Sequence, residues 1–254
     1  MPFSRLSALL LAVACLLGAI RLSPAAEGVS KGYPEGYKRL MTDVFHCYLN
    51  RDFRQALKLL DKADQLVPDT PMALNTRAAI AIEERRFADG EKYCKAALEK
   101  DPTFELATFN LAEIPFIQKN YDAARKIYRG LLDEHPADEM IQFRIYLTYL
   151  LEKNDAAAQT RLEAFKFPST SGAYYYAHAA WEFAHDNPSE GRTWVRSGDW
   201  VFSPAKNANL AAVFCDLGWL DRPKPRLTPE SAEVQGFAEP GGPPAHKGAP
   251  VEVK

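Results

Sequence analysis

The sequence is short of the motifs that mark common enzyme active sites. It holds no His-Glu-x-x-His pair of the kind that binds zinc and no glycine-rich loop of the kind that holds nucleotide phosphates. Cysteine is scarce, with 4 in 254 residues. Beyond the N-terminal apolar segment only Cys47, Cys94 and Cys215 remain, an odd number that does not indicate a disulfide framework. Cys47 and Cys94 fall at positions that predict small buried side chains. We therefore expect no cofactor and no catalytic residue.

An excess of charge of one sign is also missing. Lys and Arg together number 31, Asp and Glu number 33, and the net charge is -2 at neutral pH. Because binding to phosphate backbones relies on a basic surface, this balance argues against a nucleic-acid partner. Long apolar runs are limited to one, near the N-terminus, so no integral membrane segment is expected in the rest of the chain.

That single apolar run has the composition of a signal peptide. Arg5 precedes the run from Leu6 to Ile20, and small residues follow at 23–26. The run has about fifteen residues, fewer than the roughly twenty that span a bilayer as a helix. Residues 1–26 are therefore predicted to be cleaved, with a mature start near Glu27. The protein is expected to be exported, either to the periplasm or out of the cell.

A lipoprotein is the alternative interpretation of the same segment. Ala12-Val13-Ala14-Cys15 resembles a lipobox, which would anchor the chain through Cys15. The apolar run continues past Cys15 as far as Ile20, where a mature lipoprotein would turn polar. Cleavage without anchoring is therefore favoured.

The opposite end of the chain has a different composition. Residues 221–254 are rich in proline and glycine and hold few large apolar residues. Such a segment cannot bury enough apolar surface to offset the entropy lost on ordering, so a disordered tail is predicted. A proline-rich ligand for another domain is the alternative function for it.

Between these ends the chain repeats itself. Pro68, Pro102 and Pro136 are spaced by 34 residues. The same spacing relates four further columns of similar residues, namely Phe53, Phe87, Tyr121; Ala56, Gly90, Ala124; Leu60, Cys94, Tyr128; and Ala63, Ala97, Leu131. A small residue three places after an aromatic lets two helices approach, and the larger residue four places later fills the gap between them. The period predicts a stack of helical hairpins.

The array is predicted to occupy residues 36–220. Five hairpins are expected, followed by a capping helix, over residues 37–70, 71–104, 105–138, 139–170, 171–204 and 205–218. In the fourth hairpin the second helix is expected from Asp155 to about Phe165, and the closing proline has moved to Pro168.

Three local signals bear on individual helices. Asn187 is expected to cap the second helix of the fifth hairpin, with Glu190 closing a capping box. Gly218 is a natural stop for the last helix. Pro115 stands inside a predicted first helix, and the hydrogen bond that it removes should kink that helix or end it early.

These residues resemble the tetratricopeptide repeat family, in which a Leu-Gly pair in the first helix and Ala-x3-Phe in the second precede a closing proline. Ala56-x3-Leu60 and Ala124-x3-Tyr128 are similar to the second-helix pattern, and Leu111 stands at the leucine of the Leu-Gly pair. The resemblance implies an all-α fold: a right-handed α-solenoid of about five hairpins with a C-terminal capping helix. It also implies a non-enzymatic scaffold for a protein or peptide partner, and export suggests envelope assembly or secretion as the process.

In that family the first helices line an inner groove that holds the partner. Carrying the groove positions onto this chain gives Met41, Phe45, Tyr48, Met72, Asn75, Ile82, Leu106, Phe109, Asn110, Glu113, Phe116, Met140 and Phe143. This lining is apolar and aromatic with a few amides, which suits an extended or helical peptide with large side chains. The family's carboxylate clamp needs basic residues where this chain has Met41, Phe45 and Asn75, so an acidic tail is disfavoured. About half of the set is expected to pack in the core.

A metal-binding protein or metal-dependent enzyme is one alternative function. His178, Glu182 and His185 are spaced so that all three share one face of a predicted helix. Two imidazoles and a carboxylate are a ligand set that zinc accepts. Such residues are also common on the wetted side of a helix, which is the favoured interpretation.

A self-associating structural subunit is the other alternative. Tyr174, Tyr175, Tyr176 and Trp181 would supply the aromatic contacts that interfaces favour. Three successive tyrosines point around a helix, however, so they cannot all be exposed together.

Overall fold

A computed structural model describes residues 32–222 of the chain, and within that range it holds eleven α-helices and no strand. The helices are α3 (Glu35–Leu49), α4 (Phe53–Leu66), α5 (Pro71–Glu83), α6 (Phe87–Lys100), α7 (Glu105–Ile117), α8 (Tyr121–Glu134), α9 (Glu139–Leu151), α10 (Asp155–Leu162), α11 (Ala173–Ala184), α12 (Pro188–Phe202) and α13 (Ala208–Asp216). The predicted signal peptide, Cys15 and residues 223–254 of the predicted tail lie outside the described residues. None of the described helices is long and apolar enough to cross a membrane.

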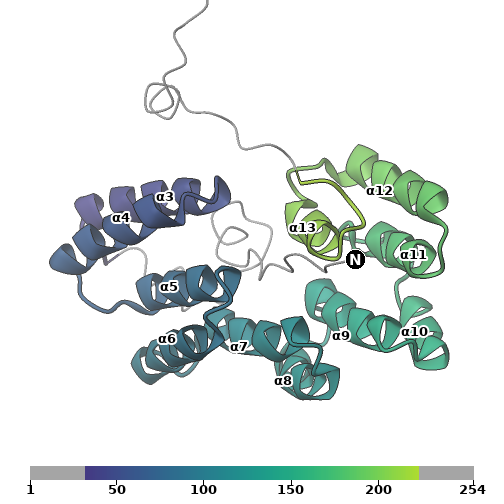
Figure 1. Cartoon of the computed structure of the whole chain (residues 1–254), viewed down its shortest axis with the longest axis horizontal. Helices are drawn as coiled ribbons and strands as arrows, with labels where there is room; N and C mark the ends of the chain where they lie inside the picture. The colour runs from purple at the N-terminus through teal and green to yellow at the C-terminus, as the bar shows by residue number, and fades with distance from the viewer. Residues whose placement is uncertain (1–31, 223–254) are drawn as a thin grey trace, which may run out of the picture. The chain divides into compact units, whose positions relative to one another are not determined.

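Ten of these helices form five hairpins, each with a first and a second helix. The pairs are α3–α4, α5–α6, α7–α8, α9–α10 and α11–α12, and Figure 1 shows them following one another in chain order. Neighbouring hairpins also touch, through α4 with α5, α6 with α7, α8 with α9, and α9 with α11. The α13 helix packs on α11. The predicted all-α solenoid of helical hairpins is confirmed.

The turn inside each of the first four hairpins has the same backbone conformation. Arg51, Arg85, Lys119 and Lys153, which are again 34 residues apart, have positive φ angles between 60° and 64°. This left-handed region normally favours glycine, which has no Cβ to clash. In three turns the next residue caps the second helix, because the side chains of Asp52, Asn120 and Asn154 accept backbone N–H groups.

The turn of the fifth hairpin lacks the helix cap that was predicted there. Asp186 has the left-handed φ, and the following Asn187 makes no side-chain cap to α12. Its amide donates instead to Glu182 Oε2, 2.8 Å away on α11. The expected capping box with Glu190 is therefore wrong, since the cap side chain is turned back towards the preceding helix.

The small-residue column lies where the two helices of a hairpin pack most closely. Ala56, Gly90, Ala124 and Ala158 are all buried. A Cβ built on Gly90 would lie only 2.6 Å from Cγ1 of Ile82, so α5 and α6 approach too closely there for alanine. The spacing of small and large residues therefore acts as predicted, by setting the distance between paired helices.

One helix is shorter than its counterparts, and another keeps the regular length in spite of an internal proline. The α10 helix has 8 residues, whereas α4, α6 and α8 have 14 each. After Leu162 the chain leaves the helix, and Phe165 turns into the core. The α7 helix runs through Pro115 to Ile117 and has 13 residues like α5, so the proline does not end it early.

Candidate partner-binding surfaces

The predicted groove residues are mostly packed inside the array. Met72 and Met140 are half-buried. The other eleven are buried, namely Met41, Phe45, Tyr48, Asn75, Ile82, Leu106, Phe109, Asn110, Glu113, Phe116 and Phe143. This corrects the expectation that half of them would be core. The reason is that a first helix such as α7 packs against its partner α8 and also against α5 and α6 of the preceding hairpin.

A buried polar layer connects three consecutive first helices. Asn110 on α7 donates a hydrogen bond to Asn75 Oδ1 on α5, with the two atoms 2.8 Å apart. One turn further along α7, Glu113 accepts a hydrogen bond from the Tyr128 hydroxyl and lies 3.1 Å from Arg144 on α9. Burial raises the pKa of the Glu113 carboxyl, and the neighbouring Arg144 guanidinium offsets part of that rise. The layer ties the second, third and fourth hairpins together.

Two donor atoms of this layer remain unsatisfied. Asn75 Nδ2 and Arg144 Nε are buried and have no hydrogen-bond partner among the described residues. The Arg144 guanidinium also lies over the rings of Phe109 and Phe116, with its carbon 5.6 Å and 5.5 Å from the ring centres. An unsatisfied buried donor costs about 1–3 kcal/mol, and both atoms lie inside the array, out of reach of a partner at its surface.

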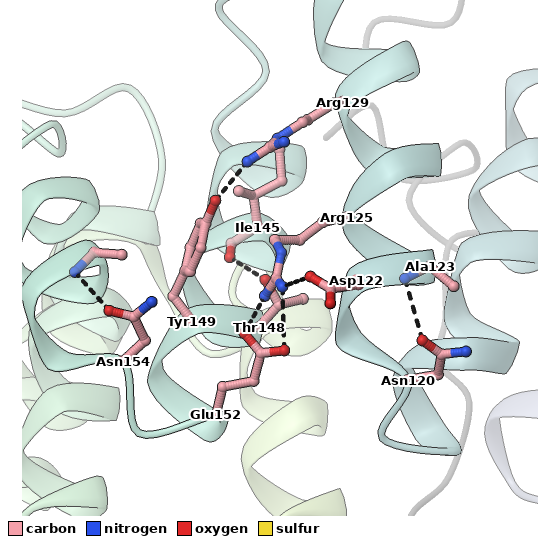
Figure 2. A network of polar contacts seen from close by, with 11 residues as sticks. Asn120, Asp122, Ala123, Arg125, Arg129, Ile145, Thr148, Tyr149, Glu152 and Asn154 are labelled. Carbon is pink, nitrogen blue, oxygen red and sulfur yellow. Dashed lines mark hydrogen bonds and ion pairs between the residues drawn. The ribbon is translucent and has the colours of Figure 1, made fainter.

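A second polar network joins α8 to α9 and is drawn in Figure 2. Arg125 is buried and pairs with Asp122 on its own helix and with Glu152 at the end of α9. Its guanidinium carbon lies 4.4 Å from the centre of the Tyr149 ring, whose hydroxyl accepts a hydrogen bond from Arg129. The network therefore holds the third and fourth hairpins together.

A pocket opens beside the shortened α10. Its volume is about 460 Å³, within the range of pockets that hold small molecules or side chains. It is lined by residues of α10, of the segment that follows it and of α11, namely Gln159, Leu162, Glu163, Phe165, Lys166, Phe167, Tyr174 and His178. Of this set, only Tyr174 and His178 were predicted from the sequence as candidate site residues. The early end of α10 is what exposes the others, and the repeat period does not report it.

Comparison with known proteins agrees with this architecture. Two family models, both described as tetratricopeptide repeat, match the chain over residues 81–144 and 49–105. A curated relative is the protein STIP1 homolog of Dictyostelium discoideum, which is 27% identical over 134 residues. That match covers 50% of this chain and 21% of the relative, so the chain spans about a fifth of the relative's length. Residues 49–144 of the chain therefore carry tetratricopeptide repeats.

Tetratricopeptide repeat domains bind protein partners, and proteins of the family are generally non-enzymatic scaffolds. In this tetratricopeptide repeat protein the side chains of the predicted metal site make other contacts. The His178 ring stacks on Trp194 at 4.6 Å, and Glu182 accepts the Asn187 amide. His185 Nδ1 lies 2.8 Å from the Trp181 carbonyl oxygen. His178 and Glu182 lie on α11 and His185 follows its last residue, and the three are not among the described residues whose ligand atoms lie within reach of one ion.

A different group of donor atoms comes within reach of one ion. Among residues 32–222, Glu105, Glu134 and His135 place their ligand atoms within 4.8 Å of one another. His135 Nε2 lies 2.8 Å from Glu105 Oε1, and all three side chains are at least partly exposed. The sequence pattern missed this group because Glu105 begins α7 whereas the other two residues end α8.

The tyrosines of the predicted self-association surface are divided by the helix that carries them. Tyr176 is fully buried and donates a hydrogen bond to Asp199 Oδ1, 3.1 Å away on α12. Tyr174, Tyr175 and Trp181 are half-buried. Tyr176 is therefore a core residue, as helical geometry requires for one of three successive side chains.

Proposed function

We propose that this chain is an exported, non-enzymatic scaffold that holds a protein partner during envelope assembly, secretion or a related process. Five stacked hairpins provide an extended surface, which is the usual basis of partner binding in repeat proteins. Export rests on the sequence of residues 1–26, in which a basic residue, an apolar run and small residues follow in order. Either the periplasm or the extracellular space fits that pattern.

The observation that carries the proposal is the series of first helices in five consecutive hairpins, α3, α5, α7, α9 and α11. The buried hydrogen bond between Asn110 and Asn75 and the ion pair between Glu113 and Arg144 tie three of these helices together. A row of connected helices offers an extended partner a continuous surface. We infer that the partner presents an extended segment along the first helices.

The rim of this surface favours an apolar segment. Met72 and Met140, the predicted groove residues that reach solvent, lie on the first helices of the second and fourth hairpins. Methionine is flexible and polarisable, so it adapts to varied apolar side chains. The basic residues that would hold a partner's terminal carboxylate are replaced by Met41, Phe45 and Asn75, which argues against an acidic tail as the bound segment.

Site-specific photocrosslinking tests this surface. A photoreactive amino acid replaces Met72 or Met140, one position at a time, in the protein expressed in its own cells. We expect a defined crosslinked species from both positions. Leu66 is the matched control, because it is 50% exposed but lies on a second helix. Equal crosslinking from Leu66, or none from the two methionines, would remove the first helices from the proposal.

Export is tested separately. Cell fractionation followed by N-terminal sequencing of the mature protein should place the chain outside the cytoplasm, with its first residue near Glu27. Replacing Leu10 and Leu11 by Lys should retain an uncleaved chain inside, because a signal peptide needs its apolar core. An uncleaved protein in the cytoplasmic fraction would contradict the proposed location and leave the crosslinking result to stand by itself.

A further inference from the structure

The fourth hairpin holds a pocket at the point where α10 ends early. The α10 helix ends at Leu162, and the following segment carries Phe165 inwards and leaves Phe167 67% exposed. The Phe167 ring lies tilted against Tyr174 of α11, with the ring centres 5.9 Å apart, and both rings line the pocket. Aromatic walls with a few polar groups suit a large, flat side chain.

A side chain of that kind projects from the next hairpin of the same protein. Trp200, near the C-terminal end of α12, is 89% exposed, and Val201 beside it is 45% exposed. Tryptophan is usually buried to a large extent, because exposure of the large apolar indole ring to water is unfavourable. Trp200 is not among the residues that line the pocket of its own chain. Among the described residues, its indole is therefore free to contact another molecule.

Charge near the two features identifies that molecule. Arg196, one turn before Trp200, donates a hydrogen bond to Thr193 and forms no ion pair within residues 32–222. Glu163 in the pocket wall accepts a hydrogen bond from Gln159 and likewise has no ion-pair partner in that range. Lys166 lines the same pocket, so Glu163 supplies its carboxylate beside one amino group. The unpaired Arg196 next to Trp200 thus matches an aromatic pocket that holds the unpaired Glu163, and both belong to this chain.

We propose that Trp200 of one copy inserts into the α10–α11 pocket of a second copy, with Arg196 of the first facing Glu163 of the second. The contact joins two different surfaces. A dimer held by one such contact therefore retains one free Trp200 and one free pocket, and further copies can add unless the assembly closes into a ring. This self-association goes beyond the proposed scaffold function, because it does not use the first helices of hairpins two to four.

Sedimentation equilibrium of the purified chain tests the proposal. We expect the average mass to rise with protein concentration over about a hundredfold range. Trp200→Ala should weaken association about tenfold or more, because buried tryptophans dominate interfaces. Leu66→Ala is the matched control, since Leu66 is 50% exposed on α4 and should leave association unchanged. Trp200 is too exposed for its loss to unfold the chain, so a monomeric Trp200→Ala variant supports the contact directly.

The pocket side needs its own variants. Gln159→Trp, at an exposed position of α10, should fill the pocket and weaken association to a similar extent. A mixture of Trp200→Ala and Gln159→Trp chains should then form dimers and nothing larger, because one intact tryptophan meets one intact pocket. Glu163→Arg together with Arg196→Glu should restore association that either change alone weakens.

Three outcomes would overturn the proposal. The chain could sediment as a monomer at every concentration, Trp200→Ala could associate as strongly as the unaltered chain, or the mixed variants could remain monomeric. In the last two cases, any self-association would have to use another surface. A monomeric chain that crosslinks through Trp200 to a different protein or to lipid would assign the tryptophan to that contact instead.

Discussion

Cys94 occupies the position at which each second helix packs a large side chain towards its partner. It is fully buried, and burial raises the pKa of its thiol to about 12. The thiolate that reacts with alkylating reagents is therefore almost absent at neutral pH, and the reagent cannot reach the sulfur. Cys47 and Cys215 are free and only half-buried.

Alkylation of the folded protein should consequently be selective. We expect iodoacetamide at pH 8 to modify Cys47 and Cys215 much faster than Cys94, as measured by peptide mass spectrometry. Adding denaturant should bring the three rates together, which is the control for intrinsic reactivity. Rapid labelling of Cys94 without denaturant would mean that α5 and α6 separate readily in the native state.

His135 carries a predictable dependence on pH. A hydrogen bond to the Glu105 carboxylate raises the pKa of the His135 imidazole, with Asp138 and Glu134 nearby adding to the effect. A pKa raised by folding means that the protonated imidazole stabilises the folded chain. That contribution is fully present below the unfolded value near 6.5 and is lost as the pH rises through the folded value.

Glu105→Gln should lower the pKa of His135 towards its ordinary value. Titration of the imidazole signals by NMR measures this shift directly. His178 is the internal control, because burial lowers its pKa and Glu105 is not among the groups that perturb it. The proposed interaction would be refuted by an unchanged His135 titration in the Glu105→Gln protein.

For single residues, the sequence predicted burial and pairing only in part. The column that contains Cys94 correctly predicts a buried thiol, because a fixed period repeats the same packing position. Cys47, which was also predicted to be buried, is half-exposed. The buried pair of Glu113 and Arg144 could not be found from sequence, since its members lie on α7 and α9 and their spacing is not the repeat period.

Among the elements, the turn between paired helices offers a test of backbone strain. Lys153 has φ of 60° and an exposed side chain. A residue with a Cβ is disfavoured in this region by roughly 1–2 kcal/mol, and glycine loses part of that advantage through the greater freedom of its unfolded chain. Lys153→Gly should therefore stabilise the protein by about 0.5–1 kcal/mol.

Urea denaturation measures the change in the free energy of unfolding. Lys126→Gly is the matched control, because Lys126 is exposed in the interior of α8, where glycine should destabilise by about 1 kcal/mol. If both substitutions destabilise the chain to the same extent, the left-handed turn contributes no strain.

The elements also show where sequence periodicity stops being informative. Hairpins follow from the 34-residue period, because each small-and-large column requires two helices at close range. The early end of α10 does not follow from it: Phe165 is buried by leaving the helix, and Pro168 disfavours helical geometry in the residue before it. Likewise, a periodic apolar stripe cannot report that a first helix is covered from several sides at once, which is why the predicted groove residues proved to be buried.

For residues 32–222 as a whole, the core is uneven along the array. One continuous apolar cluster runs from Ile82, at the end of α5, to α13 and includes Phe143, Tyr146 and Phe214. The first hairpin has a separate cluster that reaches only the beginning and middle of α5. Repeat arrays are stabilised by each unit and by its neighbours, so a terminal unit with its own small core should open first.

Ion pairs limit that opening at the boundary between the first and second hairpins. Arg77 on α5 lies 2.9 Å from Asp61 and 2.7 Å from Asp64, both on α4. Its side chain is only 13% exposed, so the pairs are partly shielded from solvent. Removing the guanidinium would leave two neighbouring carboxylates without compensation, and the boundary should weaken.

Hydrogen exchange followed by mass spectrometry should reveal this order of opening. In the unaltered chain we expect amides of α3 and α4 to exchange before those of α9 and α11. Arg77→Ala should accelerate exchange in α3 and α4 and leave α9 and α11 unchanged, because coupling in a linear array passes only between neighbours. Arg39→Ala, on the exposed side of α3, is the control for loss of a positive charge. Simultaneous exchange of all the helices would show that the described array opens as one cooperative unit despite its divided core.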